Sequence, residues 1–382
     1  MREARKIVVV AGEASGDAHA GRMIAALKAI RPEIEVSGIG GDNLRKAGAD
    51  IFTDFSELAV MGLVEVLKSY RRIKTIFNQL VSRLESEQPD LLVLVDYPGF
   101  NLKLAKKAHK LGIPVFYYIS PKVWAWRPGR VKTIKRYVDH MAVLFPFEQS
   151  LYQQAGVPVS CVGHPLVDAV SSTLNVEQAK TKLGFDPERR VLGLFPGSRR
   201  SEVEALLPVM LQAAEKIHHR HFDLEVLLPL APGLDLEFIQ PILSRSSLPI
   251  KVVSADFYDV IRSCDAIVAA SGTVTLEIAL IGVPHLIVYR VAPMSYRILK
   301  RLVKIPYVGL CNIVTEKALI TELIQDEVTA DNLDKNLAQL LTDPQTKARA
   351  EYIRQEVLHA LGPAGGAENA ARAVIAMLDK TK

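Results

Sequence analysis

The chain has 382 residues, a length that allows two ordinary domains, each with its own core. Hydrophobic residues make up 49% and charged residues 23%, a composition typical of globular proteins rather than disordered ones. The net charge of +5 is small, so the positions of the charges matter more than their total. We expect no membrane span and no signal peptide, because no uncharged stretch approaches the roughly 20 apolar residues that cross a bilayer.

Short β-branched segments alternate with helical patterns along the first part of the chain. Several are apolar throughout, which is typical of parallel strands buried on both faces. The predicted strands are 6–11, 35–39, 91–96, 114–120, 140–145 and 157–163. After a polar, helical seam near 165–190 the alternation starts again. The predicted strands of this second series are 191–197, 224–230, 250–254, 266–271 and 284–290.

This order predicts an α/β protein with two tandem, doubly wound, Rossmann-like domains facing each other across a cleft. We place the domains at residues 1–165 and 166–360. The helical segment within 361–382 fits either domain, including a crossing back to the first. Ligands of open α/β sheets bind at the carboxyl ends of the strands, so the turns after the strands are the candidate sites.

The first such turn reads AGEASGD, residues 11–17. Its glycines permit a tight turn or a close approach of a ligand. Ser15 or Asp17 would suit the N-cap of the following helix. The spacing is not GxGxxG, so a dinucleotide site is poorly supported. Two interpretations stay open: a capped tight turn, or a site for the hydroxyl groups of a sugar acceptor formed by Ser15, Gly16 and Asp17.

Asp96 ends the apolar strand LLVLVD and precedes a Pro-Gly turn. A carboxylate at such a strand end is partly desolvated, which raises its pKa and suits it to act as a general base. The alternative is that Asp96 caps the helix that starts near Asn101.

An anion-binding pattern follows strand 191–197, where the chain reads Pro-Gly-Ser-Arg before a helix. Backbone N–H groups at a helix N-terminus bind anions, and the Arg199 guanidinium suits phosphate oxygens. Gly197, Ser198 and Arg199 therefore predict a phosphate site, although this is not a Walker A loop. The alternative is that Arg199 is an ordinary surface arginine.

The turn after strand 266–271 also opens a helix, with Ser271, Gly272 and Thr273. Glu277 lies one turn further along an otherwise apolar helix, so its carboxylate needs a partner. A ribose diol is one candidate, and a nearby arginine is the other. Together with the preceding turn, this pattern favours a nucleotide diphosphate site in the second domain.

Two long stretches contain basic residues and no acidic ones. Residues 97–138 hold ten Lys or Arg, and residues 278–315 hold five more. Such runs suit an anionic membrane surface, and Trp124 and Trp126 suit an interface or a core. Charge alone also fits nucleic acid, but no nucleic-acid-binding motif accompanies it, so we expect no such partner.

The segment 58–80 begins with apolar residues on more than one helix face and continues with basic ones. This pattern predicts a helix in the membrane interface, whose basic flank meets no nearby acid. The apolar residues are Val60, Met61, Leu63, Val64, Val66 and Leu67. The alternative is a helix buried between the sheet and a neighbouring element.

Eight stretches in this order resemble the lipid-A-disaccharide synthases, inverting glycosyltransferases of the two-Rossmann-domain GT-B type. They are AGEASGD, ELAVMGLVEVL, SPKVWAWRPGR, LFPFE, VGHPLVD, LFPGSR, AASGTVTLE and YVGLCNIV. The resemblance implies transfer of 2,3-diacylglucosamine from its UDP derivative to 2,3-diacylglucosamine 1-phosphate, forming a β-1',6-linked disaccharide in lipid A biosynthesis. It also implies a peripheral protein on the cytoplasmic face of the inner membrane, and it leaves open whether copies form a homo-oligomer.

Carried onto this chain, the resemblance makes Asp96 the base and Arg199 a catalytic contact to the diphosphate. The implied UDP-binding residues are Gly197, Ser198, Arg199, Ser271, Gly272, Thr273, Glu277 and Asn312. The acceptor-binding candidates are Ser15, Gly16, Asp17, Trp126 and Arg127. No cofactor and no metal are implied. Two alternatives fit the same plan: a UDP-sugar 2-epimerase, or a non-catalytic UDP-sugar-binding protein.

Overall fold

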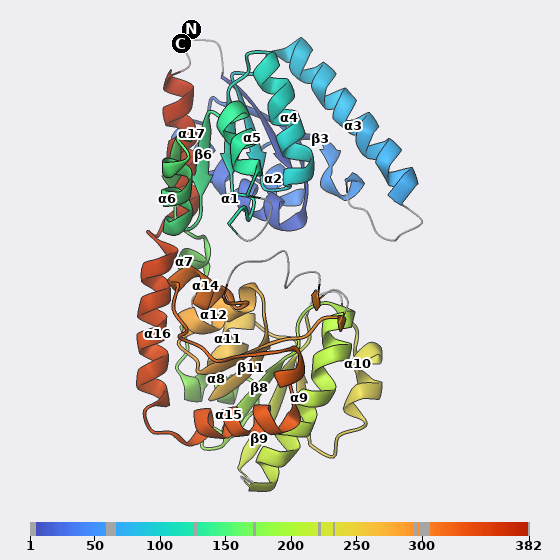
Figure 1. Cartoon of the computed structure of the whole chain (residues 1–382), viewed down its shortest axis with the longest axis vertical. Helices are drawn as coiled ribbons and strands as arrows, with labels where there is room; N and C mark the ends of the chain where they lie inside the picture. The colour runs from blue at the N-terminus through green and yellow to red at the C-terminus, as the bar shows by residue number, and fades with distance from the viewer. Residues whose placement is uncertain are drawn as a thin grey trace. The chain divides into compact units, whose positions relative to one another are not determined.

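The protein divides into two compact units, which are described separately here. The first comprises Met1–Asp168 together with Leu361–Lys382, and the second comprises Ala169–Ala360 (Figure 1). The structure, a computed structural model, describes residues 5–58, 66–124, 128–170, 173–220, 223–231, 234–293, 296–297 and 306–380, without the side chains of 66–70. None of the helices in these ranges is long and apolar enough to cross a membrane.

The first unit is built on a seven-stranded parallel sheet with the order β3-β2-β1-β4-β5-β6-β7. Its strands are β1 Lys6–Ala11, β2 Glu35–Gly40, β3 Asp50–Asp54, β4 Leu91–Val95, β5 Val115–Tyr118, β6 His140–Val143 and β7 Val159–Cys161. Strand β4 is buried over its whole length, because helices cover both faces of the sheet.

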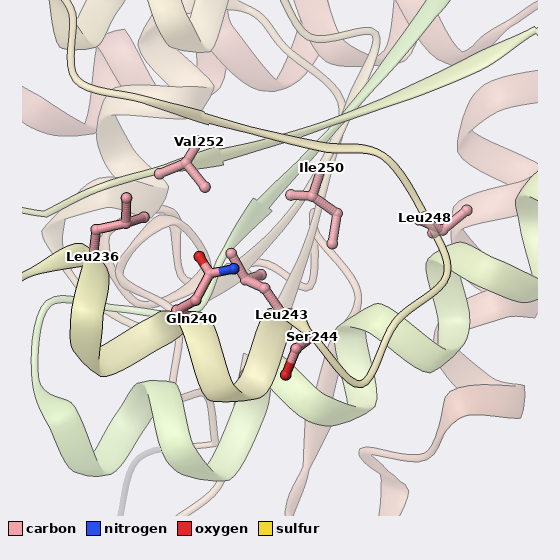
Figure 2. Close-up of a pocket in the computed structure, with 7 residues that line it drawn as sticks. All are labelled: Leu236, Gln240, Leu243, Ser244, Leu248, Ile250 and Val252. Atoms are coloured by element: carbon pink, nitrogen blue, oxygen red, sulfur yellow. The ribbon is translucent and has the colours of Figure 1, made fainter.

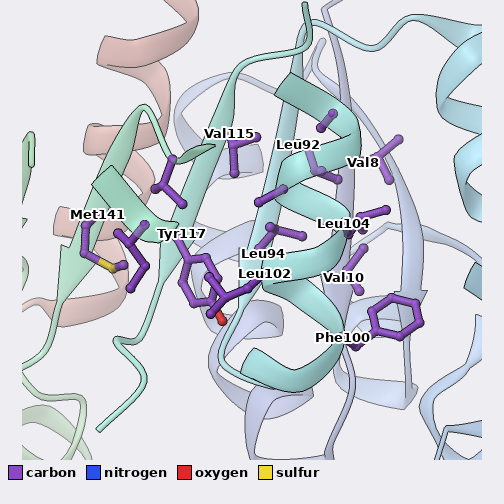
Figure 3. Packing of buried hydrophobic residues seen from close by; sticks show 14 of the residues in the cluster. Val8, Val10, Leu92, Leu94, Phe100, Leu102, Leu104, Val115, Tyr117 and Met141 are labelled. Carbon is purple, nitrogen blue, oxygen red and sulfur yellow. The ribbon is translucent and has the colours of Figure 1, made fainter. Parts of the chain in front are cut away.

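Helices pack on both faces of this sheet. They are α1 Ala14–Ile30, α2 Asp42–Lys46, α3 Val66–Glu87, α4 Pro98–Lys110, α5 Arg130–Tyr137, α6 Pro146–Gln154, α7 Leu166–Ala169 and α17 Gly366–Lys380, with the 3-10 turn η1 Phe55–Glu57. Side chains of α3, α4 and α5 form one core with Val8, Leu92 and Tyr117 of the sheet. Figure 3 shows the part of this core in which α4 packs on the strands. The alternate strand residues face the other side, where α1 packs against α17.

The C-terminal helix α17 is part of the first unit. Asp168 accepts hydrogen bonds from the backbone N–H groups of Gly365 (2.8 Å) and Gly366 (3.1 Å), which fixes the start of α17. At the other end of the helix Asp379 forms an ion pair with Arg31 of α1 (3.3 Å).

The second unit contains a six-stranded parallel sheet with the order β10-β9-β8-β11-β12-β13. Its strands are β8 Arg190–Phe195, β9 Leu224–Pro229, β10 Ile250–Val253, β11 Ala266–Ala270, β12 His285–Tyr289 and β13 Glu322–Ile324. Its helices are α8 Val176–Lys182, α9 Arg200–Arg220, α10 Leu236–Leu243, α11 Phe257–Arg262, α12 Thr273–Ile281, α14 Leu310–Thr315, α15 Ala330–Thr342 and α16 Thr346–Leu361, with the 3-10 turn η2 Gln325–Glu327. Helices α9, α10 and α15 bury one face of the sheet, and α8, α11 and α12 bury the other.

The prediction of two parallel, doubly wound α/β sheets is confirmed. Each predicted strand segment overlaps one strand of the structure, with β2 and β8 extending one residue beyond the prediction. The strands that the prediction missed are β3 and β13, which lie at sheet edges and are only partly buried. The predicted cap of the first helix was wrong: α1 begins at Ala14 with Glu13 as N-cap, so Ser15 and Asp17 lie inside the helix.

Candidate active site

The turn after β4 holds two adjacent non-glycine residues in the left-handed region. The φ angle is 46° at Asp96 and 45° at Tyr97, a conformation that costs on the order of 1–3 kcal/mol for each residue. Two side chains hold the strained peptide by its carbonyl oxygen. The Tyr117 hydroxyl donates to the Asp96 carbonyl oxygen at 2.6 Å, and Asn101 Nδ2 donates to the same oxygen at 2.8 Å. The backbone of the turn at Asp96 is therefore held by surrounding side chains.

The carboxyl group of Asp96 lies in an environment suited to a base. Burial raises its pKa above the ordinary value of 3.8, and the nearby charge of Glu13 raises it further. The Tyr97 backbone N–H and Lys122 oppose this rise. Asp96 is not the helix cap of the alternative interpretation, because α4 begins at Pro98 with Tyr97 as its N-cap. Sequence reasoning missed Glu13, although it lies within the AGEASGD stretch.

The turns after β1 and β4 pack directly on each other. A Cβ atom on Gly12 would come within 2.3 Å of the Tyr97 ring, so only glycine allows this contact. The Tyr97 hydroxyl donates to the carbonyl oxygen of Leu58 (3.3 Å). Ser15 is exposed beside this contact, and Gly16 is buried against the backbone of Val95.

Asp17 does not belong to an exposed acceptor site. Its side chain is buried and accepts hydrogen bonds from Gly41 N (2.6 Å), Asn43 N (3.0 Å), Asn43 Nδ2 (2.8 Å) and Leu44 N (3.3 Å). These are donors at the start of the short helix α2, which lack partners within the helix. The role predicted for Asp17 is corrected accordingly: its carboxylate joins α1 to α2.

Trp124 is anchored by Glu148, a buried carboxyl group that sequence reasoning did not single out. Trp124 Nε1 donates to Glu148 Oε1 at 3.1 Å, and the Trp124 ring meets Phe147 edge to face. Burial raises the pKa of Glu148 to about 7, although hydrogen bonds, first of all the one from Trp124, act to lower it. Trp126 and Arg127, both predicted acceptor residues, lie outside the described residues.

In the second unit, β8 and β11 are neighbours in the sheet, so the turns that follow them lie at the same edge. After β8, Gly197 has a φ of 106°. The backbone N–H groups of Ser198 (3.2 Å) and Arg199 (3.3 Å) donate to Glu202 Oε2, and Arg199 Nη1 donates to Glu202 Oε1 (2.8 Å). Three donors of this turn thus converge on one carboxylate, and the predicted phosphate site stays a prediction.

The turn after β11 leads into α12, which begins at Thr273 with Gly272 as N-cap. The Ser271 hydroxyl donates to the carbonyl oxygen of Val308 (2.7 Å). Glu277 accepts a hydrogen bond from the Tyr258 hydroxyl (3.4 Å), and among the described residues no arginine forms an ion pair with it. Burial raises the pKa of Glu277.

The nucleotide-binding role predicted for Asn312 is also corrected, because its side-chain amide makes its hydrogen bonds within the fold. It is buried, and its Nδ2 donates to the Ile320 carbonyl (2.7 Å) and to Glu322 Oε1 (2.8 Å). Its Oδ1 accepts from the backbone N–H groups of Leu319 and Ile320, both at 3.0 Å. These bonds tie α14 to the segment leading into β13 and leave no amide group for a nucleotide.

The described part of α3 packs on the sheet. Ile76, Leu80 and Leu84 are buried in the core of the first unit. Arg72 forms an ion pair with Glu57 (3.0 Å), an acid 15 residues earlier in the chain. Val60, Met61, Leu63 and Val64 lie outside the described residues, and the side chains of Val66 and Leu67 are not described.

A surface pocket lies between α10 and β10 in the second unit (Figure 2). It is lined by Leu236, Gln240, Leu243, Ser244, Leu248, Ile250 and Val252. Without a charged group in its lining, this pocket does not suit a diphosphate. In the described part of the chain, no three His, Cys, Asp or Glu side chains come together as a metal site.

Comparison with known proteins identifies the family to which the chain belongs. The family model for lipid-A-disaccharide synthetase matches residues 7–375. The chain belongs to this family. It is 47% identical to the lipid-A-disaccharide synthase of Geobacter sulfurreducens, over 98% of each chain. It is 45% identical to that of Nitrosococcus oceani, over 98% of this chain and 96% of the relative. Membership makes the chain a glycosyltransferase of lipid A biosynthesis.

Solved structures agree on the fold. The calicheamicin glycosyltransferase aligns with a TM-score of 0.61 at 16% identity, over 100% of this chain and 99% of that one. The UDP-GlcNAc 2-epimerase from Neisseria meningitidis aligns with a TM-score of 0.59 at 14% identity, over 98% and 100%. Both activities occur on this fold, so the fold does not separate a transferase from an epimerase. The family match does, and it does not favour the two predicted alternatives.

Proposed function

We propose that the chain transfers 2,3-diacylglucosamine from its UDP derivative to the 6-hydroxyl of 2,3-diacylglucosamine 1-phosphate. The hydroxyl oxygen attacks the anomeric carbon from the side opposite UDP, the bond to UDP breaks, and the configuration inverts. Asp96 receives the proton of the hydroxyl group. The products are the β-1',6-linked disaccharide 1-phosphate and UDP.

The observation that carries this proposal is the strained, supported turn at Asp96. A left-handed aspartate followed by a left-handed tyrosine persists only where the surroundings hold it, and such strain clusters at functional sites. The raised pKa brings Asp96 closer to the range in which a carboxylate accepts a proton efficiently. Ser15 and Gly16 remain acceptor candidates on the neighbouring turn, together with Trp126 and Arg127.

The donor site is proposed at the turns after β8 and β11. Negative charge develops on the leaving diphosphate, and the N–H groups of Ser198 and Arg199 with the Arg199 guanidinium are placed to stabilise it. Losing one such donor costs on the order of 3 kcal/mol in the barrier. Glu277 is proposed to meet the ribose, with Gly197, Ser271, Gly272 and Thr273 shaping the turns. Asn312 is not part of this proposal.

The test of the base is Asp96→Asn, assayed by UDP release that requires the acceptor, in detergent micelles. We expect a loss of at least about 100-fold in turnover with UDP affinity unchanged. Asp90→Asn is the matched control, because Asp90 precedes β4 at the opposite end of the same strand and pairs with Arg5. Near-normal turnover of Asp96→Asn would eliminate Asp96 as the base.

The pH dependence gives a second check. Asp96 must be ionised to accept a proton, and its pKa is raised, so turnover falls as the pH drops through this raised value. We therefore expect the acid limb of the wild-type pH profile at a higher pH than an exposed aspartate would give. An acid limb near pH 3.8 would contradict the assignment.

We further propose that the protein works as a peripheral protein on the cytoplasmic face of the inner membrane, held by the start of α3 and the segment before it. Changing Leu63, Val66 and Leu67 to serine should weaken binding to anionic vesicles in flotation and leave UDP binding intact. Leu236→Ser is the matched control, since Leu236 is a half-exposed leucine of the second unit. Equal vesicle binding by all variants would refute this role.

A further inference from the structure

The donors of the turn after β8 are already occupied by a side chain of the protein. One oxygen of Glu202 accepts from two successive backbone N–H groups, those of Ser198 and Arg199, and the other accepts from the Arg199 guanidinium. The carboxylate, in the first turn of the 21-residue helix α9, thus occupies N–H donors of the kind that bind anions at helix N-termini. Glu202 is an internal ligand of this site.

The turn is shaped around this carboxylate. A Cβ atom on Gly197 would lie 2.3 Å from Glu202 Oε2, so any larger residue would push the carboxylate away. Gly197 also has a φ of 106°, which other residues rarely adopt. The Glu202 side chain is 28% exposed and that of Arg199 is 78% exposed. The carboxylate is therefore sheltered, while the guanidinium reaches outward.

We infer that Glu202 competes with the donor's diphosphate for the turn and must leave it before UDP or UDP-sugar binds. This inference rests on the donor site proposed above. The same N–H groups cannot give their full hydrogen bonds to both anions, and two anions at one set of donors repel each other. Glu202 therefore lowers the affinity for the donor and for UDP alike.

The competition has a use in turnover. When UDP leaves, the carboxylate returns to the N–H groups, so these donors regain a partner within the protein. Affinity is reduced by the fraction of molecules in which the turn is free. If the turn is free in about a tenth to a fifth of molecules, removing the competitor tightens UDP binding by about five- to tenfold.

The experiment is calorimetric titration of UDP and of uridine, without lipid, into the wild type, Glu202→Gln and Glu204→Gln. Glu204 is the matched control, because it loses the same charge on the same turn of α9 and is exposed. We expect Glu202→Gln to bind UDP about fivefold or more tightly than the wild type, with uridine affinity unchanged. Glu204→Gln should bind UDP like the wild type.

Unchanged or weaker UDP binding by Glu202→Gln would overturn the inference and leave Glu202 as a structural support of the turn. An equal gain in Glu204→Gln would also overturn it, since the effect would then be general charge. If the wild type fails to bind UDP, the proposed donor site itself falls. Glu202→Asp, which keeps the charge but is too short to reach all three donors, is the second variant should Glu202→Gln not fold; it too should bind UDP more tightly.

Discussion

Replacing Tyr117 by phenylalanine removes one hydroxyl group and tests whether the strained turn matters for catalysis. Tyr117 is fully buried, and its hydroxyl donates at 2.6 Å to the carbonyl oxygen of Asp96. A buried hydrogen bond contributes about 1 kcal/mol net, and more when the acceptor is left without any partner. Here Asn101 Nδ2 stays at 2.8 Å from the same oxygen, so the loss is at the lower end.

A loss of about 1 kcal/mol is comparable with the strain of on the order of 1–3 kcal/mol stored at Asp96. If all of it appears in the barrier, turnover falls about fivefold. The assay is acceptor-dependent UDP release at saturating substrates, with UDP affinity measured in parallel. We expect kcat to fall and UDP affinity to stay, because the hydroxyl touches the turn of the base and not the donor site.

Tyr118→Phe is the control that gives this test its meaning. Tyr118 is the next residue of β5, equally buried, but its hydroxyl has no hydrogen-bond partner within the described structure. Its removal should leave kcat unchanged. Turnover of Tyr117→Phe at the wild-type rate would show that the hydroxyl does not support catalysis. An equal loss in both variants would also refute its role, because it would indicate general loosening of the core.

Three further predictions concern stability and its pH dependence. Asp17→Asn should lower the free energy of unfolding in urea by about 2–3 kcal/mol and spare UDP affinity. Asn312→Ala should cost a similar amount; selective loss of UDP affinity at full stability would restore its nucleotide role. Because the pKa of Glu148 is raised from 4.5 to about 7, wild-type stability should fall as pH rises through this window. Glu148→Gln should flatten that dependence; an unchanged slope would show that Glu148 is not its source.

The sequence allowed the two sheets to be predicted because parallel strands buried on both faces read as continuous apolar runs. The edge strands β3 (DIFTD) and β13 (ELI) lack that pattern, being short and partly exposed. The turns at strand ends were found for the same reason, since each follows an apolar run.

Partners distant in the chain could not be predicted. Asp17 was predicted to bind a ligand because the sequence does not show where its carboxylate finds donors. These donors belong to Gly41, Asn43 and Leu44, which lie 24 to 27 residues away. The partners of Asn312 lie only 7 to 10 residues away, but the sequence does not show that the chain turns back on this side chain. Tyr117 lies hidden within an apolar strand, where nothing in the sequence shows that its hydroxyl reaches Asp96.

The return of α17 to the first unit has a consequence for how the protein is made. The second unit lies between the two segments that form the first, so it can be completed while the first still lacks its last helix. Until α17 is synthesised, the surface of α1 on which α17 packs stays exposed. At ordinary rates of synthesis this lasts on the order of ten seconds or more. The first unit to begin is therefore the last to close, and it keeps apolar surface exposed for as long as the second unit is being made.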